Sequence, residues 1–274
     1  MQFRCGAFIL DLSTPKVMGI LNVTPDSFSD GGQYTHTESA VAHALTLIED
    51  GADVLDIGGE STRPNAKPVP LQEELQRVIP VIEALVAHNI PVPISIDTYK
   101  PAVMRAAITA GASIVNDVRA LQERGALEVV TKSHAGVCLM HMQGTPQTMQ
   151  DHPYYDDVVA EVKDFLRARR DVCLAAGISN DRILLDPGFG FGKTRAHNIA
   201  LAKALAELLA LDCPLLVGLS RKSVLGQVTG NDVDARLYAS VAAAVVSAMQ
   251  GAHLLRVHDV KATVEALKVV TALQ

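Results

Sequence analysis

Eight short apolar runs recur along the chain, and most of them end in a polar or charged residue. Runs this short, in which apolar and polar positions do not alternate cleanly, are typical of strands that are buried on both faces. The runs are Val17–Leu21, Val54–Ile57, Ile94–Ile96, Ile114–Val115, Val137–Met140, Ile183–Leu185, Leu215–Leu219 and Leu254–Val257. They predict a parallel sheet that is covered by helices.

Stretches with helical periodicity separate these runs. Pro80 should bend the first stretch, and Gly111, Gly177 and Gly251 stand where three of the helices would end. The predicted helices are Glu73–His88, Pro101–Ala110, Asp156–Ala175, Ile199–Leu209 and Asp234–Gln250.

Eight strands that alternate with helices in 274 residues predict an α/β fold, a (β/α)8 TIM barrel. We expect one domain over residues 1–274, because no linker or repeat divides the chain. Phe3–Leu12 is expected to form a short N-terminal β-hairpin that closes the bottom of the barrel. The number of strands alone leaves a doubly wound open sheet as the alternative.

Composition narrows the class of protein. The chain is 49% hydrophobic and 20% charged, so it can bury a large core, and its net charge of −6 argues against salt-driven binding of nucleic acid. Four widely spaced cysteines predict neither a disulfide framework nor a zinc site, and they fit a reducing cytoplasm. The most apolar helix candidate, Ala239–Met249, is about 11 residues long and too short to span a bilayer. We therefore expect a cytoplasmic protein with no membrane partner.

The glycine-rich segment Gly188–Thr194 fits neither common phosphate-binding pattern. A Walker loop needs glycine where Pro187 stands, and the dinucleotide fingerprint needs glycine where Lys193 stands. We therefore expect Lys193 to contribute little to diphosphate binding. The sequence also lacks the His-Glu-x-x-His and Gly-x-Ser-x-Gly motifs, which removes support for zinc-dependent and serine-dependent hydrolysis.

Polar residues follow the apolar runs, and in a barrel the carboxyl ends of all strands share one mouth. Any one of these residues could be an ordinary cap or turn residue, but the whole set points to a shared site. Its carboxylates and amides suit a ring with N–H and carbonyl groups, and its cations suit an anionic group. The residues are Asn22, Asp56, Asp97, Asn116, His141, Asp186, Ser220, Lys222, Arg256 and His258. We expect Asp56 to be structural or to support a neighbouring site residue, and His141 to be a hydrogen-bonded structural histidine at a strand end.

Longer motifs surround these positions and resemble those of a known family. Met18–Gly32 (MGILNVTPDSFSDGG) and Gly58–Pro64 (GGESTRP) are similar to the two signatures of the dihydropteroate synthase family. The resemblance continues in order through Ile96–Thr98, Asn116–Asp117, Leu139–Met142, Leu185–Lys193, Ser220–Ser223 and Arg256–Asp259.

This resemblance implies a transferase that joins 6-hydroxymethyl-7,8-dihydropterin diphosphate to para-aminobenzoate and releases 7,8-dihydropteroate and diphosphate. It implies a Mg²⁺ cofactor, with Asn22 as a ligand, and a homodimer. The pterin diphosphate site would comprise Thr62, Asp97, Asn116, Asp186, Lys222, Arg256 and His258, of which Asp97, Asp186 and Lys222 would be catalytic. The para-aminobenzoate site would comprise Phe28, Arg63, Pro64, Phe189, Lys222 and Ser223. Two loops, 22–32 and 58–70, are expected to be ordered by the diphosphate before para-aminobenzoate binds.

Two other functions remain open at this point. A methyltetrahydrofolate-binding domain of a corrinoid methyltransferase shares the ring-binding Asp and Asn residues but needs no diphosphate clamp, so the 22–32 and 220–222 motifs speak against it. A non-catalytic pterin-binding paralogue should have lost the residues that hold the diphosphate, and here all of those residues are present. Asn65 departs from the glycine that many relatives have at this position.

Overall fold

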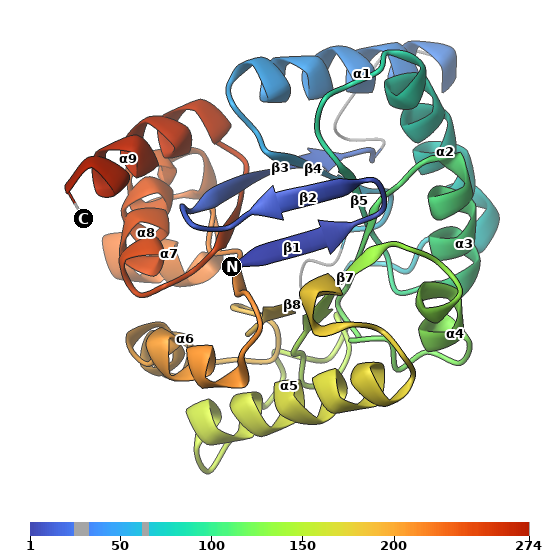
Figure 1. The fold of residues 1–274 in the computed structure, drawn as a ribbon. Coiled ribbons are helices and arrows are strands. Elements are labelled where there is room, and N and C mark those ends of the chain that lie inside the picture. The colour runs from blue at the N-terminus through green and yellow to red at the C-terminus, as the bar shows by residue number, and fades with distance from the viewer. Residues whose placement is uncertain (25–32, 62–65, 274) are drawn as a thin grey trace.

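The computed structural model describes residues 1–24, 33–61 and 66–273, and within them eight parallel strands form a barrel (Figure 1). The strands are β3 (Lys16–Asn22), β4 (Val54–Gly58), β5 (Ile94–Asp97), β6 (Ile114–Asp117), β7 (Gly136–Met140), β8 (Ile183–Asp186), β9 (Leu216–Val217) and β10 (Leu254–Val257). They pair in the order β8-β7-β6-β5-β4-β3-β10-β9. An isolated parallel bridge between Leu185 of β8 and Leu215, directly before β9, brings the two ends of this order together and nearly closes the ring. The predicted TIM barrel is confirmed, and the open sheet is wrong.

Helices follow the strands and surround the barrel (Figure 1). The α-helices are α1 (Gln33–Glu49), α2 (Leu71–Ala87), α3 (Pro101–Ala110), α4 (Ala126–Thr131), α5 (Val158–Ala175), α6 (Arg195–Lys203), α7 (Ser223–Thr229), α8 (Leu237–Met249) and α9 (Val260–Leu273). Short 3₁₀ helices are η2 (Asn180–Arg182), η3 (Leu205–Leu211) and η4 (Val233–Ala235). In the described part of the chain, none of the helices combines the length and apolar character needed to cross a membrane.

Most predicted helices are present, with altered ends. Pro80 lies inside α2, which continues through it, and the predicted helix 199–209 divides into α6 and η3. Gly111 and Gly251 end their helices with φ values of 118° and 95°, a left-handed backbone that glycine adopts without steric cost.

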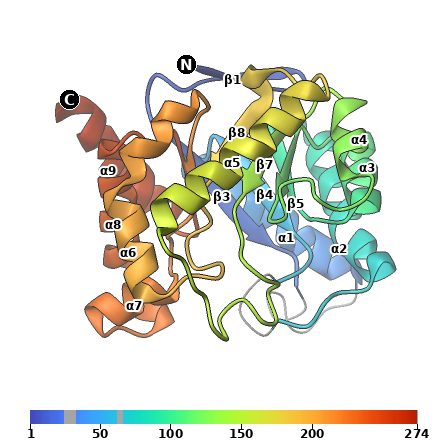
Figure 2. The ribbon, with the colours of Figure 1, turned by 90° about the horizontal axis from the view of Figure 1, so that it is seen from below.

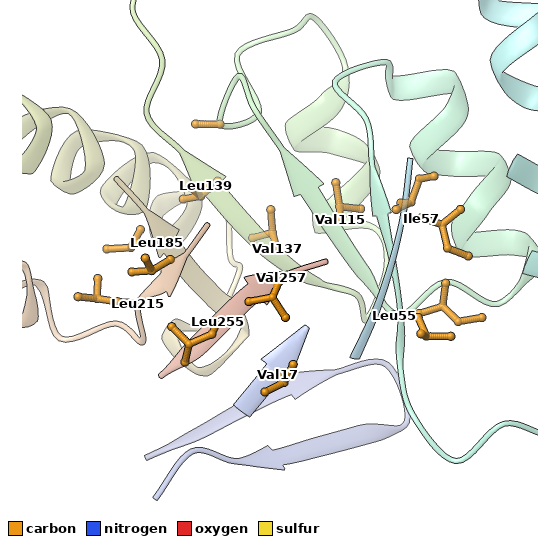
Figure 3. Packing of buried hydrophobic residues seen from close by; sticks show 14 of the residues in the cluster. Val17, Leu55, Ile57, Val115, Val137, Leu139, Leu185, Leu215, Leu255 and Val257 are labelled. Atoms are coloured by element: carbon orange, nitrogen blue, oxygen red, sulfur yellow. The ribbon is translucent and has the colours of Figure 1, made fainter. Parts of the chain in front are cut away.

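The barrel strands contribute to two hydrophobic clusters, because successive side chains on a strand point to opposite faces. One cluster lies between the strands and the helices and includes Leu55, Val115 and Leu255 (Figure 3). The other includes Met18 and Leu254 together with residues of the hairpin.

The hairpin consists of β1 (Gln2–Cys5) and β2 (Phe8–Asp11), and it lies at one end of the barrel (Figure 2). Phe3 and Cys5 are fully buried in the second cluster. The hairpin therefore closes the bottom of the barrel, as the sequence predicts, and leaves the opposite end as the open mouth.

Candidate functional site

Four acidic or amide side chains near the carboxyl ends of four strands are buried in the structure. Asp56, Asp97, Asn116 and Asp186 are at most 9% exposed. Their apolar neighbours in sequence belong to the cluster between strands and helices, so these polar positions face the inside of the barrel. A polar residue that interrupts an apolar run is the signal from which the sequence predicts them.

Arg256 of β10 crosses the barrel and links two of these carboxylates. Its Nε donates to Asp56 Oδ2 at 2.6 Å, and its Nη2 donates to Asp97 Oδ2 at 2.7 Å. Asn116 Nδ2 also donates to Asp56 Oδ2, at 3.2 Å. Burial alone would lower the pKa of Arg256, but the two carboxylates hold this pKa above its ordinary value. Asp56 thus orients Arg256 and Asn116, which is the structural role expected for it.

One carboxylate oxygen of Asp97 is available to a ligand. Its Oδ1 is buried and has no hydrogen-bond partner among the described residues. Burial raises the pKa of Asp97 to about 7, although the positive charge of Arg256 opposes this shift. Because an unpaired buried acceptor is costly, an N–H donor of a bound ligand would be favoured here.

Asp186 and Lys222 form the other side of the site. Asp186 Oδ1 accepts the backbone N–H of Gly188 at 2.7 Å, and burial raises the pKa of this carboxyl group. The Lys222 ammonium donates to the carbonyl of Phe189. Burial lowers the pKa of Lys222 to about 8, while the charge of Asp186 opposes the shift. The two groups of opposite charge therefore stabilise each other's charged forms in the mouth.

Gly218 lies beside two cationic side chains of the mouth, with space for a Cβ atom in ordinary van der Waals contact. A Cβ atom there would lie 3.7 Å from Arg256 Cβ and 3.9 Å from Lys222 Nζ. A larger side chain at this position would extend into the space beside both cations.

The glycine loop after β8 serves close packing. Gly188 has a φ of 68°, and a Cβ atom on it would overlap the carbonyl oxygen of His141. Gly192 has a φ of 62° and packs against the backbone of Gln143. These glycines permit a tight turn and a close approach of two backbones.

Lys193 is 3% exposed, and its ammonium points into the protein. Nζ lies 2.8 Å from Nδ1 of His141 and donates to the carbonyls of Gly188 and Phe191 at 2.9 and 3.1 Å. Burial lowers the pKa of Lys193 to about 7 and that of His141 to about 3. His141 is therefore a hydrogen-bonded structural histidine, as expected, and Lys193 holds the glycine loop in place.

The structure corrects the expectation for Phe189. Its side chain is 0% exposed and belongs to the hydrophobic core, so it cannot line an open para-aminobenzoate pocket. Phe191, two residues later, is only partly buried, and Lys222 Nζ lies 4.8 Å from its ring centroid. Phe191 is the phenylalanine of this loop that lies beside the site, and only its orientation in the structure distinguishes it from Phe189.

The remaining predicted residues lie around the mouth or outside the described segments. Asn22 ends β3, and a Cβ atom on Gly58 would lie 3.8 Å from its Oδ1. His258 Nδ1 lies 3.0 Å from the Ser220 hydroxyl, and Ser223 is exposed at the start of α7. Phe28, Thr62, Arg63 and Pro64 lie outside the residues that the structure describes.

A charged cluster beside Asp97 was not predicted. Glu74 is 1% exposed, accepts a hydrogen bond from Thr98 at 2.6 Å and forms an ion pair with Lys100. The Lys100 ammonium also contacts the Glu60 carboxylate and the carbonyl of Val69, the latter at 2.8 Å. Lys100 therefore holds both ends of segment 60–69. The signal available in the sequence was a glutamate on the side of α2 that its apolar residues bury. The partners of Glu74, however, are distant from it in sequence.

Comparisons with known proteins agree with this geometry. The family model described as "Pterin binding enzyme" matches residues 18–258. Dihydropteroate synthase of Escherichia coli K12 is 56% identical over 263 residues, which cover 96% of this chain and 93% of that protein. A structure of the Xanthomonas albilineans dihydropteroate synthase with 4-aminobenzoic acid has a TM-score of 0.94, 55% identity, and coverage of 100% and 98% of the two chains. Another, in complex with 7,8-dihydropteroate, has a TM-score of 0.91, 53% identity, and coverage of 100% and 99%. The chain therefore belongs to the dihydropteroate synthase family of pterin-binding enzymes.

Proposed function

We propose that the protein condenses 6-hydroxymethyl-7,8-dihydropterin diphosphate with para-aminobenzoate to form 7,8-dihydropteroate and diphosphate. The observation that carries this proposal is the pair of buried carboxylates Asp97 and Asp186 in the barrel mouth, with the partly buried Lys222 beside them and one oxygen of Asp97 unpaired among the described residues. Membership of the family and a relative solved with 7,8-dihydropteroate support the same reaction.

The pterin ring fits the acidic side of the mouth. Its N–H groups donate to Asp97 and Asp186, while the Asn116 amide and the Lys222 ammonium complete its binding site. Carboxylates held in a buried site favour positive charge on the ring more strongly than carboxylates in water. This arrangement therefore suits a reaction in which the ring becomes cationic.

The displacement then proceeds by an SN1-like route. The bond between the pterin CH₂ and the diphosphate oxygen breaks, and its electron pair leaves with the diphosphate. The amine nitrogen of para-aminobenzoate attacks the resulting cation and loses a proton. Because an aromatic amine is neutral at pH 7 and carries a lone pair, no general base is essential. Thr62, Arg256 and His258 face the departing anion in this proposal.

Para-aminobenzoate binds on the outer side of Lys222. Its neighbours in the proposal are Phe191 and Ser223, together with Phe28, Arg63 and Pro64 from the segments outside the described residues. The partly buried Phe191 ring beside Lys222 supports this placement.

We propose that Mg²⁺ binds at the mouth together with the diphosphate. Among the described residues, no group of three or more His, Cys, Asp or Glu side chains could hold a metal ion. Mg²⁺ commonly takes few protein ligands and completes its shell with water and phosphate oxygens. The Asn22 amide oxygen at the end of β3 would supply one such ligand. When bound, the ion would offset negative charge on the diphosphate.

A synthesis assay tests the proposed reaction directly. The purified protein is incubated with the dihydropterin diphosphate, para-aminobenzoate and Mg²⁺, and dihydropteroate is measured by chromatography. Omission of either substrate is the control, and absence of the product from a folded protein would refute the proposal.

Calorimetric titration tests the metal and the order of binding. Para-aminobenzoate should bind poorly to the protein alone and at least tenfold more tightly with diphosphate and Mg²⁺, because the anion links two loops at the mouth. Asn22→Ala or chelation of Mg²⁺ should remove most of this gain. The four titrations are of the protein alone, of the protein with diphosphate and Mg²⁺, of the same mixture after chelation of Mg²⁺, and of Asn22→Ala. Equal affinity for para-aminobenzoate in all four would mean that the pocket exists without the anion.

A homodimer through α8 and α9 is proposed as the assembled form. Tyr238 is 84% exposed, and Val246, Met249 and Val269 are also exposed on these two neighbouring helices (Figure 1). An apolar surface of this kind is typical of a subunit interface. Tyr238→Glu should shift the protein to monomers in sedimentation equilibrium, whereas Tyr154→Glu, at a similarly exposed tyrosine, should not. A parent protein that is monomeric at micromolar concentration would refute the dimer.

A reducing cytoplasmic location is also proposed, since all four cysteines are buried free thiols.

A further inference from the structure

The turn that carries Lys222 has an unusual backbone at the preceding residue. Arg221 has a φ of 58°, in the left-handed region that residues with a side chain rarely adopt. Lys222 follows with extended backbone and precedes α7. A residue in this conformation persists only where its surroundings hold it, and such residues concentrate at functional sites.

Residues at the start of α8 hold both backbone groups of Arg221. The Arg221 N–H donates to Ser240 Oγ at 2.9 Å, and Arg236 Nη1 donates to the Arg221 carbonyl at 3.0 Å. Gly226 of α7 makes this second contact possible, because a Cβ atom on it would overlap the Arg236 guanidinium. The conformation of the turn thus depends on α8 as well as on its own sequence.

The Arg221 side chain ties the turn to the loop after β10. Its Nε and Nη2 donate to the two carboxylate oxygens of Asp259 at 3.0 and 2.5 Å. Such a bidentate pair fixes orientation as well as distance. Asp259 follows His258, which contacts Ser220 at 3.0 Å. Two successive residues of one loop therefore contact two successive residues of the other.

We propose that Arg221 is a positioning residue, which through Asp259 fixes the turn that directs Lys222 toward Asp186. The inference rests on the proposed function, since Lys222 acts on the pterin there. Arg221 itself contacts no substrate in this scheme. Its pair with Asp259 also sets the spacing between Lys222 and the loop that begins at His258, so that ring and diphosphate contacts form together.

The test uses Arg221→Met, which keeps the length of the side chain and removes the guanidinium. We expect kcat/KM for the dihydropterin diphosphate to fall about tenfold or more, because small displacements in a site are costly. The affinity for a pterin ligand, measured by calorimetry, should fall as well.

The pH profile gives a readout that a purely structural role would not change. Burial lowers the pKa of Lys222 to about 8. The negative charges of Asp186 and Asp97 raise this pKa, and the positive charges of Arg256 and Lys193 lower it. If the turn moves, Lys222 becomes hydrated and its pKa rises toward its ordinary value of 10.5. The alkaline limb of kcat/KM should therefore shift to higher pH in the variant.

Three further variants keep the test decisive. Arg221→Gly suits the left-handed backbone and replaces Arg221→Met if the latter fails to fold. Gly226→Ala displaces Arg236 without altering the ion pair, and it should shift kcat/KM and the alkaline limb in the same direction. Arg167→Met removes a comparable but exposed ion pair on α5 and should leave both quantities unchanged.

The possible results separate this inference from the proposed function. If the parent makes dihydropteroate and folded Arg221→Met has the same kcat/KM and the same alkaline limb, the positioning role is overturned and the function stands. If the parent makes none, the function is overturned, and pterin affinity then decides the positioning role: a loss in Arg221→Met supports it, and no change overturns it.

Discussion

Lys193→Met is the change whose effect the structure predicts most directly. Methionine preserves most of the buried side-chain volume and removes the ammonium that contacts His141, Gly188 and Phe191. An unpaired buried acceptor costs about 1–3 kcal/mol. With three acceptors, even the lower value gives a loss of about 3 kcal/mol in the free energy of unfolding.

The size of this loss should depend on pH. Burial lowers the pKa of Lys193 in the folded protein from 10.5 to about 7. Between these two values, the unfolded chain retains a proton that the folded chain has released, so the stability of the parent rises with pH. Lys193→Met lacks this titration. The difference between parent and variant should therefore widen as the pH increases from 7 to 9.

Urea unfolding at several pH values measures both effects. A loss of about 3 kcal/mol should also lower Tm by roughly 6–12 °C for a chain of this size. Lys132→Met is the matched control, because that lysine directly follows α4, is exposed, and among the described residues pairs with the exposed Glu128 of that helix. Its free energy of unfolding should change by less than about 0.5 kcal/mol. Equal stability of the two variants, or a difference that stays constant with pH, would refute the reasoning.

Three other changes give distinct expected results. Asp97→Asn should lower kcat by about 10²–10³ in a folded protein, because the carboxylate stabilises a developing cation; steady-state kinetics measures the loss and circular dichroism checks the fold. Burial raises the pKa of Asp97 to about 7, so kcat/KM of the parent should fall below that pH as the carboxylate is protonated. Gly188→Ala should yield little folded protein because its Cβ would overlap a carbonyl oxygen, whereas Gly177→Ala meets no atom within 4 Å and should lose only about 1 kcal/mol in thermal unfolding. Lys100→Met should raise the KM for para-aminobenzoate more than the KM for the pterin substrate, because it releases both ends of segment 60–69, and an equal rise in both would contradict this role.

The strands could be predicted from sequence because burial on both faces leaves a distinct pattern. Each run is mostly apolar, and a polar residue that ends or interrupts it is the one that the barrel places near its mouth. The helices were less visible: α4 and α7 are shorter than two turns, so periodicity has little room to develop. In α9 the buried residues Val260, Thr263, Leu267 and Val270 stand at helical spacing, so a usable signal was present there.

The buried polar residues of the mouth could be predicted from the sequence, but the contacts between them could not. Asp97 and Arg256 are separated by 159 positions, and only closure of the barrel brings them to 2.7 Å. The exchange of Phe189 for Phe191 has a similar cause. Both residues lie in one glycine loop with identical neighbours, and the turn at Gly190 decides which ring enters the core.

The hairpin at the bottom of the barrel has a consequence for synthesis of the chain. Gly6 donates its N–H to the carbonyl of His134, and Phe3 packs against Gly136 at the start of β7. During translation at about 5–20 residues per second, that docking surface emerges about 130 residues after the hairpin, or roughly 6–26 s later. Throughout this interval Phe3 has no barrel to enter. The hairpin therefore reaches its place only after the strands up to β7 have been synthesised, and until then the apolar side chain of Phe3 stays exposed to solvent.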